Sequence, residues 1–245
     1  MYFSIIIPCY NAEKTLGRAL DSIIAQQDYV KEIILIDDGS QDQTQAIAKH
    51  YIHQHPSCTI HYHHQNNQGP AKARNKGAEL TTGEYTLFLD HDDTLCNGAL
   101  ALFQQTFLAN PNTKLLIAGA YDINGNRKKL SLPKLYPNNL EILKAYWFQQ
   151  LSIEGGATPI RTQVLKTTHY PESINHGEDI VFFSHLLSQY PAKILPIATL
   201  NSYRHPNSLR NQQKSILADG DKLTSILFNP NYLKPEYMKF KPKFH

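Results

Sequence analysis

The sequence predicts an α/β fold, with a mostly parallel central sheet, flanking helices and a less regular second half. In the first half, short apolar runs alternate with segments whose apolar residues recur at helical spacing, which is typical of right-handed βαβ units. Two of the apolar runs end abruptly in aspartates, and ligands of such sheets bind beyond the carboxyl ends of the strands. A chain of 245 residues allows one large domain of this kind or two small ones.

Five apolar runs in the first half are the predicted strands, and they cover residues 3–7, 33–36, 58–62, 85–89 and 115–118. The helix expected between the first two strands has an apolar stripe at positions 16, 19, 20, 23 and 24. We expect Asn11 to cap this helix and Glu13 to suit the positive end of its dipole. A second stripe follows the fourth strand, with Asn97 as its expected cap, and consists of Leu100, Phe103, Phe107 and Leu108.

The composition argues against several classes of protein. A net charge of +3 gives no electrostatic footprint for duplex nucleic acid, so we expect no nucleic-acid partner. Cys9, Cys58 and Cys96 are an odd, widely spaced set, which argues for a reducing compartment and against a disulfide framework. The N-terminal segment lacks the basic residues of a signal peptide, and no apolar run approaches membrane-spanning length. We therefore expect a soluble, cytoplasmic protein.

The most informative segment is residues 87–95, which read L-F-L-D-H-D-D-T-L. It places Asp90, Asp92 and Asp93 at a strand end, where their charges disfavour one another's ionisation. A hard divalent cation with oxygen ligands, Mn²⁺ or Mg²⁺, would relieve this repulsion and commonly serves a phosphate group. The alternative is an acidic surface turn in which Asp93 and Thr94 begin the next helix.

Polar residues also follow the first two predicted strands. Residues 8–11 are Pro-Cys-Tyr-Asn, and residues 37–40 are Asp-Asp-Gly-Ser. Both groups belong at the same sheet edge as the acid cluster, which predicts a shared site. An ordinary turn is the alternative for residues 37–40, because aspartate, glycine and serine all favour turns.

Residues 66–77 read N-N-Q-G-P-A-K-A-R-N-K-G and predict an anion site. Gly69 and Pro70 set a tight turn with proline at the first helical position. Free N–H groups and the helix dipole favour an anion there, and Lys72 or Arg74 can approach a phosphate. The alternative is a solvated basic helix face. Neither G-x-x-x-x-G-K-S/T nor G-x-G-x-x-G occurs in the sequence.

Four segments together resemble family 2 glycosyltransferases, which have the Rossmann-like GT-A fold. They read P-C-Y-N-A-E, I-D-D-G-S-Q-D-Q-T, N-Q-G-P-A-K-A-R-N-K-G and F-L-D-H-D-D, in the family's order over roughly the first hundred residues. The resemblance implies an inverting transferase with a nucleotide-sugar donor, most often UDP-linked, and with Mn²⁺ or Mg²⁺ as cofactor.

The resemblance also implies roles for single residues. Pro8 and Tyr10 would flank the base, and Asp38 would accept a hydrogen bond from the uracil. Asp90 would lie at the ribose and Asp92 at the metal, with Asp90 as a second candidate ligand. The other residues expected at the nucleotide sugar are Glu13, Gly69, His91 and, near the base and ribose, Arg74.

The chain is expected to divide into a donor-binding half, an acceptor-binding half of the same domain, and a tail. The boundaries are residues 1–122, 123–228 and 229–245, with a linker expected at residues 124–129. The tail interleaves aromatic residues with lysines, so it could contact the inner face of the cell membrane or be a disordered end.

In similar enzymes, small residues lie beneath the acceptor and the donor sugar. Gly155 and Gly156 are expected in that place, with a bend in a strand as the alternative. Trp147, at the end of a predicted helix, is a further candidate for acceptor contact.

The segment G-E-D-x-x-F at residues 177–182 matches the family's acidic block before a helix. The match makes Asp179 the catalytic base and gives Glu178 a supporting role, while simple helix-start chemistry is the alternative. Farther on, S-Y-R-H-P-N-S-L-R is similar to a tyrosine- and histidine-containing segment of the family, and the similarity implies His205 as a candidate third metal ligand. Arg204 and Arg210 in this segment are candidates to neutralise the diphosphate.

The residues and the resemblance together predict a metal-dependent transfer of a sugar to a hydroxyl group. The resemblance implies a glycan or lipid-linked acceptor and a role in surface polysaccharide assembly. Two other functions remain open at this stage. Residues 87–95 also fit the motif of a HAD-type phosphatase, with Asp90 as nucleophile and Asp92 as acid/base, although three βα units precede them. A non-catalytic nucleotide-sugar binder would keep Asp38, Asp90 and Asp92 without turnover.

Overall fold

A single curled sheet forms the centre of the protein in the computed structural model, which describes residues 2–174, 176–204, 220–230 and 233–239. Its strands, in the order β3-β2-β1-β4-β8-β6-β9-β5 with β7 beside β6, bring the two halves of the sequence into one sheet. The strands are β1 (Phe3–Cys9), β2 (Val30–Asp37), β3 (Ile60–His64), β4 (Tyr85–Phe88), β5 (Thr94–Leu95), β6 (Leu115–Asn124), β7 (Arg127–Ser131), β8 (Ile160–Arg161) and β9 (Ala192–Tyr203).

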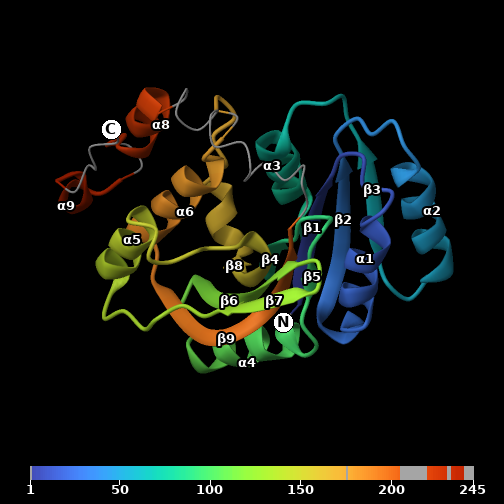
Figure 1. Cartoon of the computed structure of the whole chain (residues 1–245), viewed down its shortest axis with the longest axis horizontal. Helices are drawn as coiled ribbons and strands as arrows, with labels where there is room; N and C mark the ends of the chain where they lie inside the picture. The colour runs from blue at the N-terminus through green and yellow to red at the C-terminus, as the bar shows by residue number, and fades with distance from the viewer. Residues whose placement is uncertain (1, 175, 205–219, 231–232, 240–245) are drawn as a thin grey trace.

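Helices cover both faces of this sheet (Figure 1). The α-helices are α1 (Leu16–Ile24), α2 (Thr44–Gln54), α3 (Pro70–Leu80), α4 (Ala99–Ala109), α5 (Asn139–Trp147), α6 (Glu178–Gln189), α8 (Gly220–Leu227) and α9 (Pro235–Met238). Short 3₁₀ helices are η1 (Gln27–Tyr29), η2 (Gly155–Ala157) and η3 (Thr162–Lys166).

The first half is the parallel α/β unit that the sequence predicts. β3, β2, β1 and β4 pair in parallel, so their carboxyl ends meet at one edge of the sheet. Alternate residues of each strand point to opposite faces, and Ile5 and Ile7 pack with α1, α2 and α4. Ile6 faces α3, where a Cβ at Gly77 would collide with its side chain, and therefore belongs to the core on the other face.

The second half corrects one expectation about connectivity. Residues 124–129 are not a linker, because β6 and β7 pair through Asn124 and Arg127 as a tight antiparallel hairpin. Gly125 sits in this turn at φ +56°, a conformation that favours glycine. The proposed boundary at residue 122 consequently falls within β6 and not between two units.

Both expected helix caps are also corrected. α1 begins at Leu16, and Asn11 adopts φ +50° in the loop before it. α4 begins after Gly98, which adopts φ +77°, so Asn97 lies one residue too early to cap it. On the same helix Leu108 is exposed, whereas the other members of the predicted stripe are buried.

The described part of the tail packs on the domain. Leu233 and Tyr237 are 1% and 7% exposed and belong to the core that contains α5, α6 and α8. Tyr237 therefore has no surface to offer a membrane, while residues 231–232 and 240–245 lie outside the described residues. Among the described residues, no helix combines the length and apolarity needed to cross a membrane.

Candidate active site

The strand ends predicted to form a site do belong to adjacent strands. β2, β1 and β4 are neighbours, and they deliver Asp37 and Asp38, Tyr10, and the Asp90–Asp93 segment to one edge of the sheet. Tyr10 is 49% exposed and has a free ring surface for contact with a ligand, while Pro8 is buried within β1.

Asp38 organises the turn before α3. Its carboxylate accepts hydrogen bonds from the Gln65 side chain at 2.8 Å and from the backbone N–H groups of Gln68 at 2.9 Å and Gly69 at 2.7 Å. Gly69 adopts φ +90°, which favours glycine at this turn. Asp38 is thus 4% exposed and fixed in place, and it connects the end of β2 to the start of α3.

Asp37 and the loop after β1 complete this side of the site. Asp37 accepts hydrogen bonds from the Ser40 N–H at 2.8 Å and the Tyr62 hydroxyl at 2.5 Å. Burial and the charge of Asp37 raise the pKa of Cys9, which disfavours its thiolate. The carboxylate of Glu13 accepts a hydrogen bond from the Gln43 N–H at 3.3 Å, so it turns toward the start of α2.

The three aspartates after β4 form a compact cluster. Oxygens of Asp90, Asp92 and Asp93 lie within 4.8 Å of one another. Asp93 is 6% exposed and accepts a hydrogen bond from the Tyr203 N–H at 2.9 Å. Burial, reinforced by the two neighbouring aspartates, raises the pKa of Asp93 to about 8. Closely spaced carboxylate oxygens are the donor set that Mn²⁺ and Mg²⁺ prefer, so the cluster fits such a cation.

Two residues, Thr15 just before α1 and Arg18 within it, contact the loop that carries the aspartates, residues 90–93. Arg18 donates a hydrogen bond to the Asp92 carbonyl oxygen at 2.7 Å, and its guanidinium carbon lies 3.6 Å from the centre of the Tyr203 ring. The Thr15 hydroxyl and His91 Nδ1 share a hydrogen bond at 2.8 Å. Arg18 could not be identified from the sequence, because every residue has a backbone carbonyl oxygen and its partner therefore leaves no pattern.

Arg74 joins the acidic loop to the start of α6. Its guanidinium lies 3.0 Å from Asp90 Oδ1, 3.1 Å from Glu178 Oε1 and 3.7 Å from Asp179 Oδ1. The charges of these acids raise the pKa of Arg74 well above its usual value, against the effect of its burial. Arg74 was expected near the base and ribose, and it contacts Asp90, the residue expected at the ribose. Its position beside the ligand remains a prediction.

Glu178 and Asp179 begin α6 directly after Gly177, which adopts φ +81°. The first turn of a helix stabilises their charged forms through the dipole. The Asp179 side chain is 47% exposed, yet partial desolvation among the neighbouring carboxylates raises its pKa to about 7, an effect that Arg74 opposes and Glu178 reinforces. A carboxylate that titrates near neutral pH is suited to accept a proton from a hydroxyl group.

Gly155 and Gly156 pack under the acid cluster. A Cβ on Gly155 would lie 2.8 Å from the Phe88 carbonyl oxygen at the end of β4. A Cβ on Gly156 would lie 2.7 Å from Leu200 of β9. These glycines therefore permit η2 to approach β4 and β9 closely. The contact with β4 is at Phe88, two residues before Asp90, the first of the predicted ligands.

Trp147 does not lie where an acceptor could reach it. It is 7% exposed, its Nε1 donates to the Ser184 hydroxyl at 2.8 Å, and its ring packs against Phe228 at 5.2 Å. The sole tryptophan is thus a core residue, and the expectation of acceptor contact is corrected.

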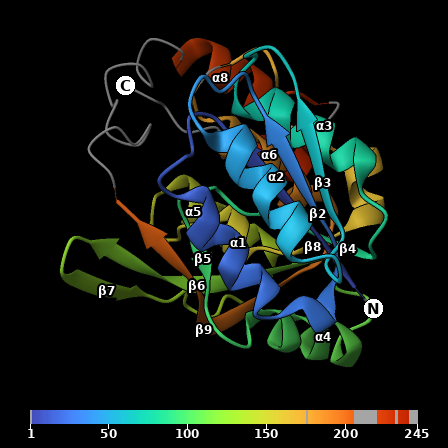
Figure 2. The same cartoon turned by 90° about the vertical axis from the view of Figure 1, so that its right-hand side faces the viewer.

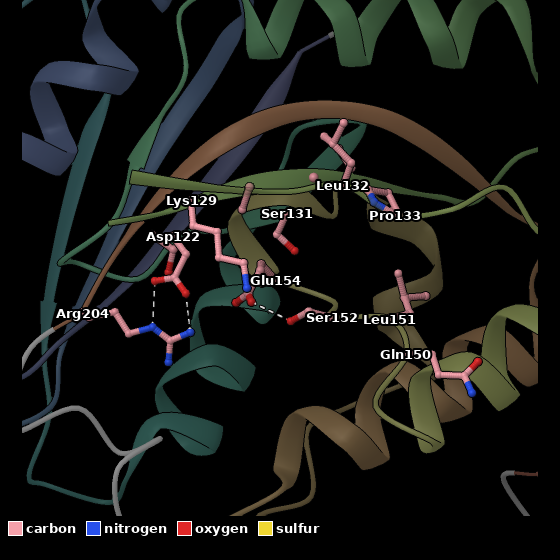
Figure 3. Close-up of a pocket in the computed structure, with 14 residues that line it drawn as sticks. Asp122, Lys129, Ser131, Leu132, Pro133, Gln150, Leu151, Ser152, Glu154 and Arg204 are labelled. Atoms are coloured by element: carbon pink, nitrogen blue, oxygen red, sulfur yellow. Dashed lines mark hydrogen bonds and ion pairs between the residues drawn. The ribbon is translucent and has the colours of Figure 1, made fainter. Parts of the chain in front are cut away.

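A cavity of about 250 Å³ opens between the β6–β7 hairpin, the end of β9 and residues 150–154 (Figure 3). Arg204 forms a two-bond ion pair with Asp122 at one end of it, at 2.8 and 2.6 Å. The Ser152 hydroxyl donates to Glu154 at 2.8 Å, and the Lys129 side chain points toward Glu154. Arg204 was expected at the diphosphate but is engaged by Asp122, and His205 and Arg210 lie outside the described residues.

The cavity adjoins the acidic cluster. Glu154 contributes to the raised pKa values of both Asp93 and Asp179, so its charge is close to each. Tyr203, which donates to Asp93, lies between the cavity residues Ser202 and Arg204. The sequence did not single out Asp122, Lys129 or Glu154.

Comparison with known proteins places these features in a family. The model of glycosyl transferase family 2 matches residues 4–168. An uncharacterized glycosyltransferase of Haemophilus influenzae is 31% identical over 237 residues, which cover 95% of this chain and 88% of the relative.

Two comparisons concern TarS of Staphylococcus aureus, a poly(ribitol-phosphate) β-N-acetylglucosaminyltransferase. The chain is 31% identical to it over 188 residues, covering 74% of this chain and 32% of TarS. The crystal structure of the 1–349 fragment of TarS in complex with UDP-GlcNAc has a TM-score of 0.76 at 26% identity, covering 93% of this chain and 66% of that chain. This chain therefore spans less than two thirds of each TarS chain.

Proposed function

Because the chain belongs to glycosyl transferase family 2 and is a glycosyltransferase with the GT-A fold, we propose that it moves a sugar from a UDP-sugar to a hydroxyl of a glycan or lipid-linked acceptor. The observation that carries the proposal is the contact of Arg74 with both Asp90 and Glu178, beside Asp179. This contact places Asp90 of the acid cluster, a candidate donor-binding residue, next to Asp179, the candidate base. The crystal structure with UDP-GlcNAc supports a UDP-linked N-acetylhexosamine or hexose as the donor.

The donor would occupy the edge formed by the ends of β2, β1 and β4. Tyr10 offers an exposed ring for the base, and Asp38 holds the turn against which the base would lie. Asp90 and Asp92, with Asp93 behind them, would hold Mn²⁺ or Mg²⁺. Such a cation, when bound, supplies positive charge that stabilises the departing diphosphate.

Asp179 would act as the base. The acceptor hydroxyl loses its proton to the Asp179 carboxylate while its oxygen attacks the anomeric carbon, and the nucleoside diphosphate leaves from the opposite side. One such displacement inverts the anomeric configuration and needs no side-chain nucleophile. Glu178, bonded to Arg74, would fix the guanidinium and so position Asp179.

The cavity beside Glu154 would receive the acceptor. Its charged residues, Asp122, Lys129, Glu154 and Arg204, are two acids and two bases, a balance that suits the hydroxyl groups of a sugar. The relationship to TarS supports a role in assembling a surface polysaccharide.

Thermal stabilisation by UDP and UDP-sugars, with and without Mn²⁺, tests the donor and the metal together. Asp92→Ala should abolish the Mn²⁺-dependent part of the stabilisation, whereas Asp179→Asn should keep it and stop transfer and donor hydrolysis. Asp28→Ala, at an exposed aspartate of η1, is the control and should behave as the unmodified protein.

The outcomes separate the competing functions. Transfer at the normal rate by Asp179→Asn would remove it as the base. Stabilisation by UDP-sugars without any turnover would identify a non-catalytic binder. Phosphate release from a phosphomonoester is not expected, because the family match includes the βα units that the phosphatase motif leaves unexplained.

A further inference from the structure

The β6–β7 hairpin and the segment after it carry an unusual combination of charge and apolar surface. Residues 127–135 read R-K-K-L-S-L-P-K-L, with four basic residues and no acidic one. Leu130, Leu132 and Leu135 are 49%, 44% and 73% exposed. We call residues 127–135 the hairpin surface, and Figure 2 shows β7 projecting from the body of the protein.

The exposed leucines are concentrated and not scattered. Three of the nine large apolar side chains exposed among the described residues come from six consecutive positions, 130–135. Leu132 also lines the cavity. A fourth, Ile197 of β9, is 50% exposed, and its backbone lies near Leu132, since a Cβ built on Gly119 would lie 2.7 Å from the Leu132 side chain and 3.3 Å from the Ile197 carbonyl oxygen. Contiguous exposed apolar surface of this kind usually marks a contact with a partner or a membrane.

The alternation of the strand separates two functions of β7. Lys129 and Ser131 face the cavity together with Asp122 and Ala120, their partners on β6. Lys128 and Leu130 point to the opposite face, where the Lys128 ammonium lies 3.8 Å from the centre of the Tyr121 ring. The face of β7 away from the cavity thus carries Lys128 and Leu130. Arg127 lies on the same side of the strand as Lys129, but it is exposed at the hairpin tip and does not line the cavity.

Edge protection, self-association and polymer binding each account for only part of this surface. Lysines on an edge strand prevent pairing with other chains, but this does not explain the leucines. Self-pairing of β7 would bring basic residues of two copies together, which is unfavourable. A soluble anionic polymer would pair with the lysines and leave the leucines in water. An anionic lipid surface satisfies both, because its headgroups attract the bases and its interface accepts leucine side chains.

We propose that the hairpin surface docks the protein on an anionic lipid bilayer. Within the described part of the C-terminal tail, Tyr237 is buried and does not supply such a contact. If the proposed function holds, docking would place the acceptor cavity near the bilayer, where a lipid-linked acceptor is anchored. The docking itself does not depend on that function.

Co-sedimentation of the full chain with phosphatidylcholine vesicles, with and without phosphatidylglycerol, tests the charged part of the contact. Binding should require phosphatidylglycerol and weaken with added salt. Arg127→Gln/Lys128→Gln/Lys134→Gln should lower the partition coefficient roughly a hundredfold, since each basic residue near an anionic surface contributes roughly fivefold. The cavity residue Lys129 is left unchanged.

A matched variant separates local contact from net charge. Lys31→Gln/Lys49→Gln/Lys166→Gln removes the same charge at exposed lysines elsewhere and should change partitioning only a few-fold. An equal loss in this variant would show that net charge alone attracts the protein and would overturn the proposal.

The apolar part has its own test. Leu130→Ser/Leu135→Ser should weaken vesicle binding roughly tenfold, whereas Leu108→Ser, at a leucine of α4 that is 55% exposed, should not. Leu135→Trp should show a blue shift of its emission on phosphatidylglycerol vesicles against the constant signal of the buried Trp147.

Two further results would overturn the proposal. The first is an unchanged emission of Leu135→Trp on vesicles, which is informative even if the serine variants fold poorly. The second is a triple glutamine variant that loses binding to soluble polyphosphate but keeps binding to vesicles, because the ligand of the hairpin surface would then be an anionic polymer.

Discussion

Removing the Arg74 guanidinium should destabilise the fold and change the titration of the site at once. Arg74 is 8% exposed and lies within 3.7 Å of three carboxylates that come from two distant parts of the chain. Arg74→Met keeps much of the side-chain volume and removes the charge. The three acids then lose the cation that they share.

The size of the effect follows from the exposure of those acids. The Glu178 side chain is 11% exposed, while Asp90 and Asp179 are 48% and 47% exposed and are screened by water. Leaving a buried charge without its partner costs roughly 3–5 kcal/mol, whereas exposed pairs contribute about 0–1 kcal/mol each. We therefore expect a loss of about 4 kcal/mol, most of it due to Glu178, and a fall in Tm of roughly 10 °C.

Thermal melting of a double variant tests this reasoning. Arg74→Met/Glu178→Gln replaces the stranded charge by a neutral amide and should recover at least half of the lost Tm. Arg161→Met is the control, because Arg161 donates to the carbonyl oxygens of Thr113 and Pro111 and should cost much less. A double variant no more stable than Arg74→Met would refute the assignment of the cost to Glu178.

Two further predictions concern pH. Because the pKa of Asp179 is raised to about 7, the transfer rate should rise as the pH increases through about 7, and an acid limb near pH 4 would show that the pKa of the base is not raised in the working site. Burial lowers the pKa of His185 to about 4, so the unfolded chain binds more protons than the folded one below the usual value of 6.5. The free energy of unfolding should therefore fall as the pH decreases from 6.5 to 4, and His185→Gln should flatten this slope in urea titrations; an unchanged slope would exclude His185 as its source.

The fold of the first half could be predicted because its elements are local. Strand and helix periods lie within short windows, and four of the predicted strands pair in parallel as expected. The β6–β7 hairpin was missed although Gly125 and Asn126, the two residues of its turn, are a hairpin signal, because the lysines of β7 suggested an exposed linker. β7 is exposed along its whole length, so it lacks the apolar alternation by which strands are recognised.

The site was predictable only in its acidic residues. Repulsion among Asp90, Asp92 and Asp93 is visible in the sequence, and their oxygens do lie close together. The contact between Arg74 and Glu178 could not be predicted from the sequence. The two residues are 104 positions apart and meet only where α3 and α6 converge in the folded protein. Trp147 was misassigned because a single indole gives no sign of which face of its helix is buried.

The balance of charge at the site itself argues for a metal-dependent donor. A nucleoside diphosphate is an anion, and the surface that would receive its phosphates presents mainly carboxylates, with Arg74 engaged between them. The acids that lie together or influence one another's pKa there are Asp90, Asp92, Asp93, Glu154, Glu178 and Asp179. Such a surface repels a diphosphate unless cations accompany it. Donor binding should therefore depend on the divalent cation. The acids contribute to the reaction because they bind this cation, which in turn binds the diphosphate.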